Sequence, residues 1–396
     1  MALTVTRPPR RLAAAGTLLL ALSACSATGE QDDSSAQPEA SPESSHDGDQ
    51  AAEAAAAPKP LRPGERRVTL RMPEPYEPSA PHGAGTDDYR CFLLDPGLDR
   101  DAWLTGTNVL PGNPDVVHHV ILFRVPPDQV DSAESMDAAT TGEGWTCFGG
   151  TGLDVVESLD DAPWLGAWAP GGAETVNQAG YGVRLDQGSR IVMQVHYNLL
   201  AGTDEDVSAT QLRLAPIDRR LTELRTMLLP APVELPCRPA HDQGALCDRD
   251  AAVADVQERF GRAGGAADGL YFLCGGGPRP GNVQSCTRTV SEPATVRGVA
   301  GHMHLLGRSI EVEVNPGTDR ARTILDIPVW DFDNQGATPV KPYRLAAGDT
   351  VKVTCRHVQW LRDELPAFEG QPERYVVWGE GTTDEMCLGI LQVTGP

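Results

Sequence analysis

The feature that most constrains the fold is a series of short segments that are β-branched or alternate between apolar and polar residues. Six stand out, at residues 67–72, 119–125, 190–200, 309–314, 349–355 and 374–379. Clusters of glycine, proline, aspartate and asparagine separate them. Such segments are typical of strands in β-sandwiches and jelly rolls. The sequence therefore predicts an all-β, antiparallel fold, with residues 250–263 as its main helix.

The amino terminus predicts export and a lipid anchor. Arginines near the start precede an uncharged apolar stretch at residues 12–22, which is too short to span a membrane as a mature helix. The stretch ends in Leu-Ser-Ala-Cys, which resembles the bacterial lipobox, whose cysteine is lipidated and becomes the mature N-terminus. We expect residues 1–24 to be a signal peptide and Cys25 to anchor the exported protein to the outer face of a bacterial membrane. Ordinary cleavage beside an incidental cysteine is the alternative.

Residues 25–66 are predicted to form a disordered, acidic tether. This segment is rich in Ser, Ala, Pro, Asp and Glu and has no aromatic or β-branched aliphatic residue, so burial cannot offset the entropy of ordering it. It holds nine acids and three bases, a charge of −6 out of −22. Residues 1–24 carry +3, so the folded part carries −19, which argues against nucleic acid as a partner.

The rest of the chain is long enough for two domains. A break near residues 216–220 predicts one domain over residues 67–216 and a second over 217–396. Eight cysteines follow Cys25, and an even number in an exported chain predicts disulfides. No Cys-x-x-Cys occurs, which leaves thiolate zinc knuckles and thioredoxin-like chemistry without support.

Five of the nine histidines fall in three compact places, as His118-His119, His196 and His302-Met-His304. Side chains alternate between the two faces of a strand, so His302 and His304 point to one side and can share a metal, while Met303 faces the core. The other four are isolated in the sequence, which assigns them no role: His46, His82, His241 and His357.

The pair His118-His119 needs a special backbone to bind one metal, because neighbours on a regular strand diverge. A strand end, a bulge or the use of different ring nitrogens would bring them together. His196 is then the obvious third ligand, and it shares a polar strand face with Gln194 and Asn198. The opposite face of that strand carries Ile191, Met193, Val195 and Tyr197.

The pair His302 and His304 also needs a third ligand, and Met386 is the candidate. It is flanked by polar residues and a cysteine, whereas a buried structural methionine more usually lies in an apolar run. Two imidazoles and a thioether are a ligand set that copper favours. The alternative for each histidine taken singly is a hydrogen-bonded core residue.

Short motifs, in this order along the chain, resemble the copper type II, ascorbate-dependent monooxygenases, the family of peptidylglycine α-hydroxylating monooxygenase and dopamine β-monooxygenase. The resemblance covers residues 67–396, with a divergent stretch at about 230–285. The motifs are RVTLRMP, DDYRC, VVHHVILF, TCFGG, GAWAPG, QVHYN, GHMHLLGR and DEMC.

The resemblance implies two tandem antiparallel, jelly-roll-like β-sandwich domains that face each other across a solvent-filled cleft, each with one copper ion. Ascorbate or a similar one-electron donor would support hydroxylation of a substrate C–H bond with O2. The implied ligands of the electron-storing copper are His118, His119 and His196, and those of the catalytic, O2-binding copper are His302, His304 and Met386. Gln194 and Tyr197, which flank His196 in the sequence, are expected to orient it.

The resemblance also implies two disulfides, Cys91–Cys147 and Cys355–Cys387. Four cysteines are left over and allow three connectivities. Short spacing favours the pairs Cys237–Cys247 and Cys274–Cys286.

Two departures from the family bear on the substrate. The positions at which the peptide-hydroxylating members hold a substrate carboxylate with Arg and Tyr are here Ala300 and Ile390. A peptide with a C-terminal glycine is therefore not the expected substrate, and an unknown small organic molecule takes its place. We expect a monomer that meets the membrane only through its lipid. The alternatives are a non-catalytic copper-binding surface lipoprotein and a purely structural surface protein.

Overall fold

The computed structural model describes residues 57–81, 86–153, 158–332 and 335–396. The predicted signal peptide, Cys25, His46 and His82 lie outside the described residues. Strands dominate the described part, in small sheets whose named pairs are antiparallel except for β8 with β11. None of the described helices is long and apolar enough to cross a membrane.

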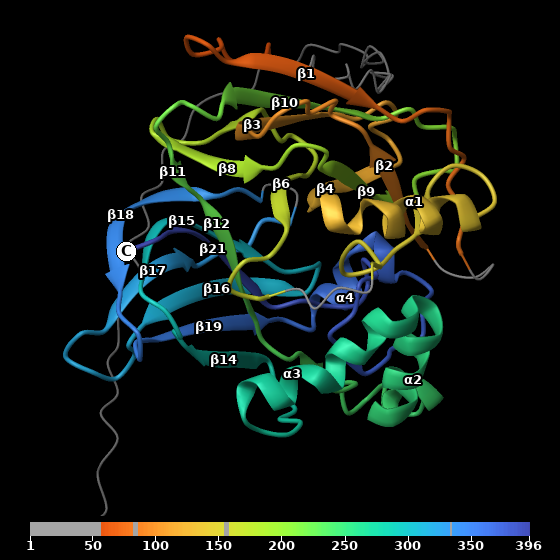
Figure 1. Cartoon of the computed structure of the whole chain (residues 1–396). Helices are drawn as coiled ribbons and strands as arrows, with labels where there is room; N and C mark the ends of the chain where they lie inside the picture. The colour runs from red at the N-terminus through yellow and green to blue at the C-terminus, as the bar shows by residue number, and fades with distance from the viewer. Residues whose placement is uncertain (1–56, 82–85, 154–157, 333–334) are drawn as a thin grey trace, which may run out of the picture. The chain divides into compact units, whose positions relative to one another are not determined.

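Strands of the first part of the chain form two sheets (Figure 1). One has the order β1-β10-β3-β8-β11 with β7 on β3, and the other has the order β5-β2-β9-β4-β6. Side chains from both sheets meet in one buried cluster, which makes the arrangement sandwich-like. The strands are β1 (Arg66–Arg71), β2 (Asp87–Leu94), β3 (Ala102–Leu110), β4 (Val117–Val125), β5 (Trp145–Thr146), β6 (Trp164–Trp168), β7 (Thr175–Val176), β8 (Tyr181–Leu185), β9 (Arg190–Asn198), β10 (Ala209–Pro216) and β11 (Thr222–Glu223).

The later strands form a second pair of sheets, β12-β21-β15-β18 and β14-β19-β16-β17, and a short ladder of β13 with β20. They share a second large buried cluster. Their bounds are β12 (Arg225–Pro230), β13 (Glu234–Leu235), β14 (Val283–Thr289), β15 (Ala294–His302), β16 (Gly307–Val314), β17 (Arg322–Ile327), β18 (Thr338–Leu345), β19 (Thr350–His357), β20 (Val376–Val377) and β21 (Leu388–Thr394).

All six strand segments expected from the sequence contain a strand. The strand expected at residues 374–379 is much shorter, since β20 has two residues. Strand β9 shows why the pattern works: the row Ile191, Met193, Val195 and Tyr197 lies in the buried cluster between the first two sheets.

Segments on either side of the expected domain boundary also pair with the other group of strands. Ala162 belongs to the second core and bridges to Thr226, and the backbone N–H of Leu228 donates to the carbonyl of Leu159. Strand β11 lies beyond the expected domain boundary, yet it pairs with β8 of the first group.

Helix α2 (Arg249–Phe260) is the helix expected at residues 250–263. Asp248 caps it by accepting a hydrogen bond from the backbone N–H of Ala251. The sequence did not predict α1 (Val130–Ala139), which buries only Ala133, or the short helices α3 (Ala266–Cys274) and α4 (Leu361–Glu364). A helix with so little buried surface has no apolar periodicity to detect.

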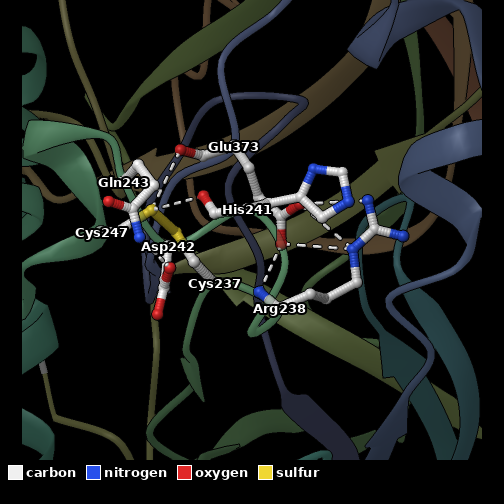
Figure 2. Close-up of a disulfide and its surroundings, with 7 residues drawn as sticks. All are labelled: Cys237, Arg238, His241, Asp242, Gln243, Cys247 and Glu373. Atoms are coloured by element: carbon white, nitrogen blue, oxygen red, sulfur yellow. Dashed lines mark hydrogen bonds and ion pairs between the residues drawn. A yellow bond between two sulfur atoms is a disulfide. The ribbon is translucent and has the colours of Figure 1, made fainter.

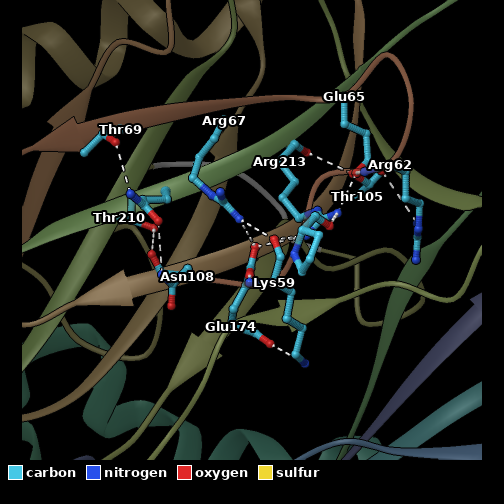
Figure 3. Close-up of polar contacts among 12 residues, drawn as sticks. Lys59, Arg62, Glu65, Arg67, Thr69, Thr105, Asn108, Glu174, Thr210 and Arg213 are labelled. Atoms are coloured by element: carbon cyan, nitrogen blue, oxygen red, sulfur yellow. Dashed lines mark hydrogen bonds and ion pairs between the residues drawn. The ribbon is translucent and has the colours of Figure 1, made fainter. Parts of the chain in front are cut away.

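The predicted tether ends earlier than residue 66. Lys59 donates from Nζ to the carbonyl of Glu174 at 2.9 Å, and the buried Arg213 binds Glu65 at 2.6 Å and Glu174 at 3.3 Å (Figure 3). Arg67 completes this ion-pair cluster through Glu174. Residues 59–65 are therefore anchored to the first pair of sheets. The sequence prediction erred because it weighed apolar content alone, and here charged side chains fix the backbone.

Four disulfides join the pairs that the sequence and the family resemblance predict, and they indicate an oxidising compartment. Arg238, beside the bond between Cys237 and Cys247, donates to both carboxylate oxygens of Glu373 (Figure 2). This ties a long connection to the segment that precedes β20. The bonds are Cys91–Cys147, Cys237–Cys247, Cys274–Cys286 and Cys355–Cys387.

Candidate metal and substrate site

Strands β4 and β9 bring three histidines together. The pairing of the two strands shifts register between Val117 and His119, so His118 is the extra residue of a β-bulge. The bulge turns both neighbouring histidines toward His196. The Nδ1 atom of His196 lies 3.2 Å from Nδ1 of His118 and 3.1 Å from Nδ1 of His119. A bulge is one of the backbone features by which the sequence predicts that these neighbouring histidines can meet.

Asp87 fixes the tautomer of His196. Its Oδ1 lies 2.8 Å from Nε2 of His196, so that nitrogen carries the proton and Nδ1 keeps a lone pair. The ring of Tyr89 stacks on His196 at a centroid distance of 4.1 Å. Burial would raise the pKa of Asp87, but the bond to His196 and the hydroxyl of Thr382 hold that pKa below its usual range.

The rings of His118 and His119 are held neutral. Burial, together with the neighbouring imidazoles, lowers the pKa of His118 to about 3 and that of His119 further below its usual value. Nitrogen lone pairs in such close contact repel one another unless a proton or a cation lies between them. Donor atoms of His118, His119 and His196 lie within 4.8 Å of one another, so these three side chains could bind one metal ion.

The second pair of histidines lies where β15 ends. The rings of His302 and His304 have a centroid distance of 5.2 Å, and Met303 between them is fully buried in the core as expected. His302 donates from Nδ1 to the side-chain carbonyl of Gln335 at 2.7 Å, and His304 Nδ1 faces the carbonyl of Asp384 at 3.3 Å. Each ring is therefore left with its lone pair on Nε2. Burial lowers the pKa of His302 to about 4 and lowers that of His304 as well.

Glu385 organises the turn that carries Met386. Its carboxylate accepts hydrogen bonds from the backbone N–H groups of His304, Leu306 and Met386. Burial would raise the pKa of Glu385, but the nearby His357 and these donors keep it low. His357 Nε2 lies 3.4 Å from the carboxylate, so this histidine supports the turn from within the core. No role for His357 is evident from the sequence.

Both histidine groups border one cavity of about 1010 Å³. Met386 lines it together with His302 and His304. The rings of His119 and His302 have a centroid distance of 6.4 Å, and Phe332 stacks on His118 at 5.0 Å. Two groups that are far apart in the sequence therefore face the same cavity.

A segment between the groups links them. Thr382 donates to Oδ1 of Asp87 from both its backbone N–H, at 3.1 Å, and its hydroxyl, at 2.6 Å. The hydroxyl of Tyr89 donates to the carbonyl of Glu380 at 2.6 Å. The acid that orients His196 thus also holds the segment that leads to Met386.

Two expected partners of His196 lie elsewhere. Tyr197 points into the core and donates to Asp206 at 3.0 Å, because neighbours on β9 face opposite sides. Gln194 lines the cavity but donates to the carbonyl of Gly150 at 2.9 Å. The residue that binds His196 is Asp87, in the DDYRC motif. This contact follows from the pairing of β2 with β9. Tyr89 lies opposite His196 in that ladder, and Asp87, two residues earlier, lies on the same face of β2.

The two donor sets differ in chemistry. Three imidazoles suit zinc, copper, iron or nickel, so the first set does not select a metal by itself. Two imidazoles beside a thioether favour Cu(I). The methionine is therefore what points to copper.

Comparisons with known proteins do not extend this picture. No protein-family model matches the chain, and no curated protein matches it. A structure of allantoicase aligns at 11% identity with a TM-score of 0.19, over 80% of this chain and 90% of that one. A Paenibacillus xanthan lyase aligns at 14% identity with a TM-score of 0.18, over 82% and 27%. The VP2 subviral particle of infectious bursal disease virus aligns at 8% identity with a TM-score of 0.19, over 86% and 74%. Scores this low carry no argument about fold or function.

Proposed function

We propose that this protein is a copper-dependent monooxygenase that hydroxylates a C–H bond of a small organic substrate with O2 and ascorbate or a similar one-electron donor. The observation that carries the proposal is the single cavity bordered by a three-histidine group and by a His-His-Met group. The motif order described above supports it independently of the geometry. The proposal includes two β-sandwich domains, one copper site in each, and an anchor at Cys25.

The residues fit two copper ions. His118, His119 and His196 would hold one through Nδ1, and His302, His304 and Met386 the other, the histidines through Nε2. Bound copper would supply one-electron storage at the first group and O2 chemistry at the second.

The chain's own residues prepare both groups. Asp87 retains the Nε2 proton of His196 and so keeps Nδ1 free as a ligand. Glu385 keeps His304 and Met386 on one turn. Neutral imidazoles need not lose a proton before a metal binds.

Copper content and O2 uptake test the proposal. The purified protein should bind two coppers per chain and show ascorbate-dependent O2 uptake that a substrate stimulates. His196→Ala should lose one copper and the uptake while remaining folded. The matched control is His241→Ala, since His241 is half exposed beside Glu373 and should lose no copper.

Two results would revise the proposal. The absence of tightly bound copper would reject it. Two bound coppers without uptake across a broad substrate screen would favour the alternative, a non-catalytic copper-binding surface lipoprotein. The anchor has its own test, because Cys25→Ser should abolish lipid labelling and release the protein from membranes.

A further inference from the structure

The wall of the shared cavity carries almost no charge. Among the described residues that line it, none is lysine, arginine or aspartate, and the one carboxylic acid is Glu380. The undescribed segments next to lining residues, 154–157 and 333–334, contain no lysine or arginine in the sequence, but they contain Asp154, Glu157 and Asp333. In the metal-free protein, an anionic ligand would therefore leave water without a cationic side chain among the described wall residues, which is a costly transfer.

Glu380 adds little negative charge near neutral pH. Its burial, and then the negative charge of Asp384, raise its pKa to about 8. Asp384 itself is engaged by Arg259, which binds both its carboxylate oxygens at 2.8 Å. Among the described residues of the wall, a cationic ligand would therefore find only the largely protonated Glu380 at pH 7.

The polar side chains of the wall are largely occupied by the protein itself. Gln194 donates to the carbonyl of Gly150, Thr226 to that of Trp164, and Asn177 to that of Leu104. Aromatic and aliphatic surfaces make up much of the rest, including Phe148, Trp164, Trp168, Phe332 and Trp378. Such a wall favours a ligand that buries apolar surface over one that depends on hydrogen bonds.

We infer that the cavity takes an uncharged, predominantly apolar organic molecule. Its volume of about 1010 Å³ lies at the upper end of the range in which pockets enclose drug-sized ligands, so a compound of roughly two or three rings fits better than a single small ring. The inference rests on the proposed function only in calling this molecule the substrate.

Binding of a matched set of probes to the full-length protein tests the inference. The probes are 2-naphthalenemethanol, 2-naphthoate and 2-naphthylmethylammonium, which share a ring system and differ in charge. Calorimetric titration at pH 7, with metal-free and copper-loaded protein, measures each affinity. We expect the alcohol to bind at least about tenfold more tightly than either ion. Equal or tighter binding of the carboxylate or the ammonium, or no binding of the alcohol, would overturn the inference.

An arginine placed in the wall should reverse the preference. Ala300 on β15 lines the cavity, and Ala300→Arg should raise the affinity for 2-naphthoate relative to the alcohol by at least about tenfold. Val283→Arg is the control, because Val283 is exposed on β14 and should change neither affinity. If Ala300→Arg does not fold, Ile390→Arg repeats the test from the register partner on β21. An arginine at either position that leaves the preference unchanged would contradict the inference.

These outcomes separate the two proposals. Preference for the alcohol in a protein that binds no copper would reject the proposed function and leave the ligand class intact. Two coppers with substrate-stimulated uptake, but tighter binding of the carboxylate, would support the proposed function and reject the inferred ligand class.

Discussion

The two histidine groups are held in different ways. His118, His119 and His196 lie on paired central strands, and the ladder of β4 with β9 fixes their spacing. His302, His304 and Met386 lie at a strand end and on a turn, where one carboxylate, that of Glu385, holds three backbone N–H groups. The first group therefore depends on sheet register, and the second depends on a single buried side chain.

The comparison also shows what the groups share. Each lies near a disulfide, since Cys91 is on β2 opposite Gln194 and Cys387 follows Met386. Asp87 connects the two groups, because it binds His196 and also Thr382, in the segment that leads to Met386. Substitutions at the two groups should consequently differ in effect unless they touch this shared acid.

The largest effect is expected at Met386. Met386→Ile keeps the apolar volume but removes the thioether, so hydroxylation should fall below detection while copper at the three-histidine group is retained. Copper content by mass spectrometry and O2 uptake measure the two parts. Met227→Ile, at another buried methionine, is the control. Unchanged turnover would remove Met386 from the mechanism.

Glu385→Gln should destabilise the fold. The buried backbone donors would lose a charged acceptor, so the free energy of unfolding should fall by about 2–4 kcal/mol. Urea unfolding measures it. Glu369→Gln, at an exposed site, should change it by less than about 0.5 kcal/mol. A Glu385→Gln protein as stable as that control would mean that the turn does not depend on this carboxylate.

Asp87→Asn should weaken copper binding mainly at the first group, where Asp87 contacts His196 directly. Loss of the carboxylate on a ligating histidine typically costs about 10–100-fold in metal affinity. Competition with a copper chelator measures the affinity, and Asp115→Asn, on the exposed loop before β4, is the control. Equal weakening of both coppers would show instead that Asp87 acts through Thr382 on the whole cavity.

A further effect concerns pH. Glu380 has its pKa raised from 4.5 to about 8, so the folded protein keeps a proton that the unfolded chain releases above pH 4.5. Stability should therefore fall as pH rises through this window, by up to about 1.4 kcal/mol per pH unit from this group. Glu380→Gln should remove that contribution. Unfolding of both proteins at pH 5, 6.5 and 8 measures it, and parallel pH curves would refute the raised pKa.

Much of the fold could be read from local pattern. Period-2 alternation identified β9 and the row of its side chains that enters the core between the first two sheets, although both faces of this strand are buried. The same rule placed Met303 in the core. It could not find α1, whose ten residues bury only Ala133, or the hydrogen bond that anchors Lys59 and the ion pair that anchors Glu65.

The sequence alone identified the candidate metal ligands, because ligand types and strand alternation are local properties. It named His118, His119, His196, His302, His304 and Met386 as candidates, and the structure brings the first three together. Tertiary structure alone decided that both groups border one cavity, that Asp87 rather than Tyr197 binds His196, and that the cavity wall is nearly uncharged. These facts depend on strand pairing and on contacts between residues up to 295 positions apart, which no local pattern encodes.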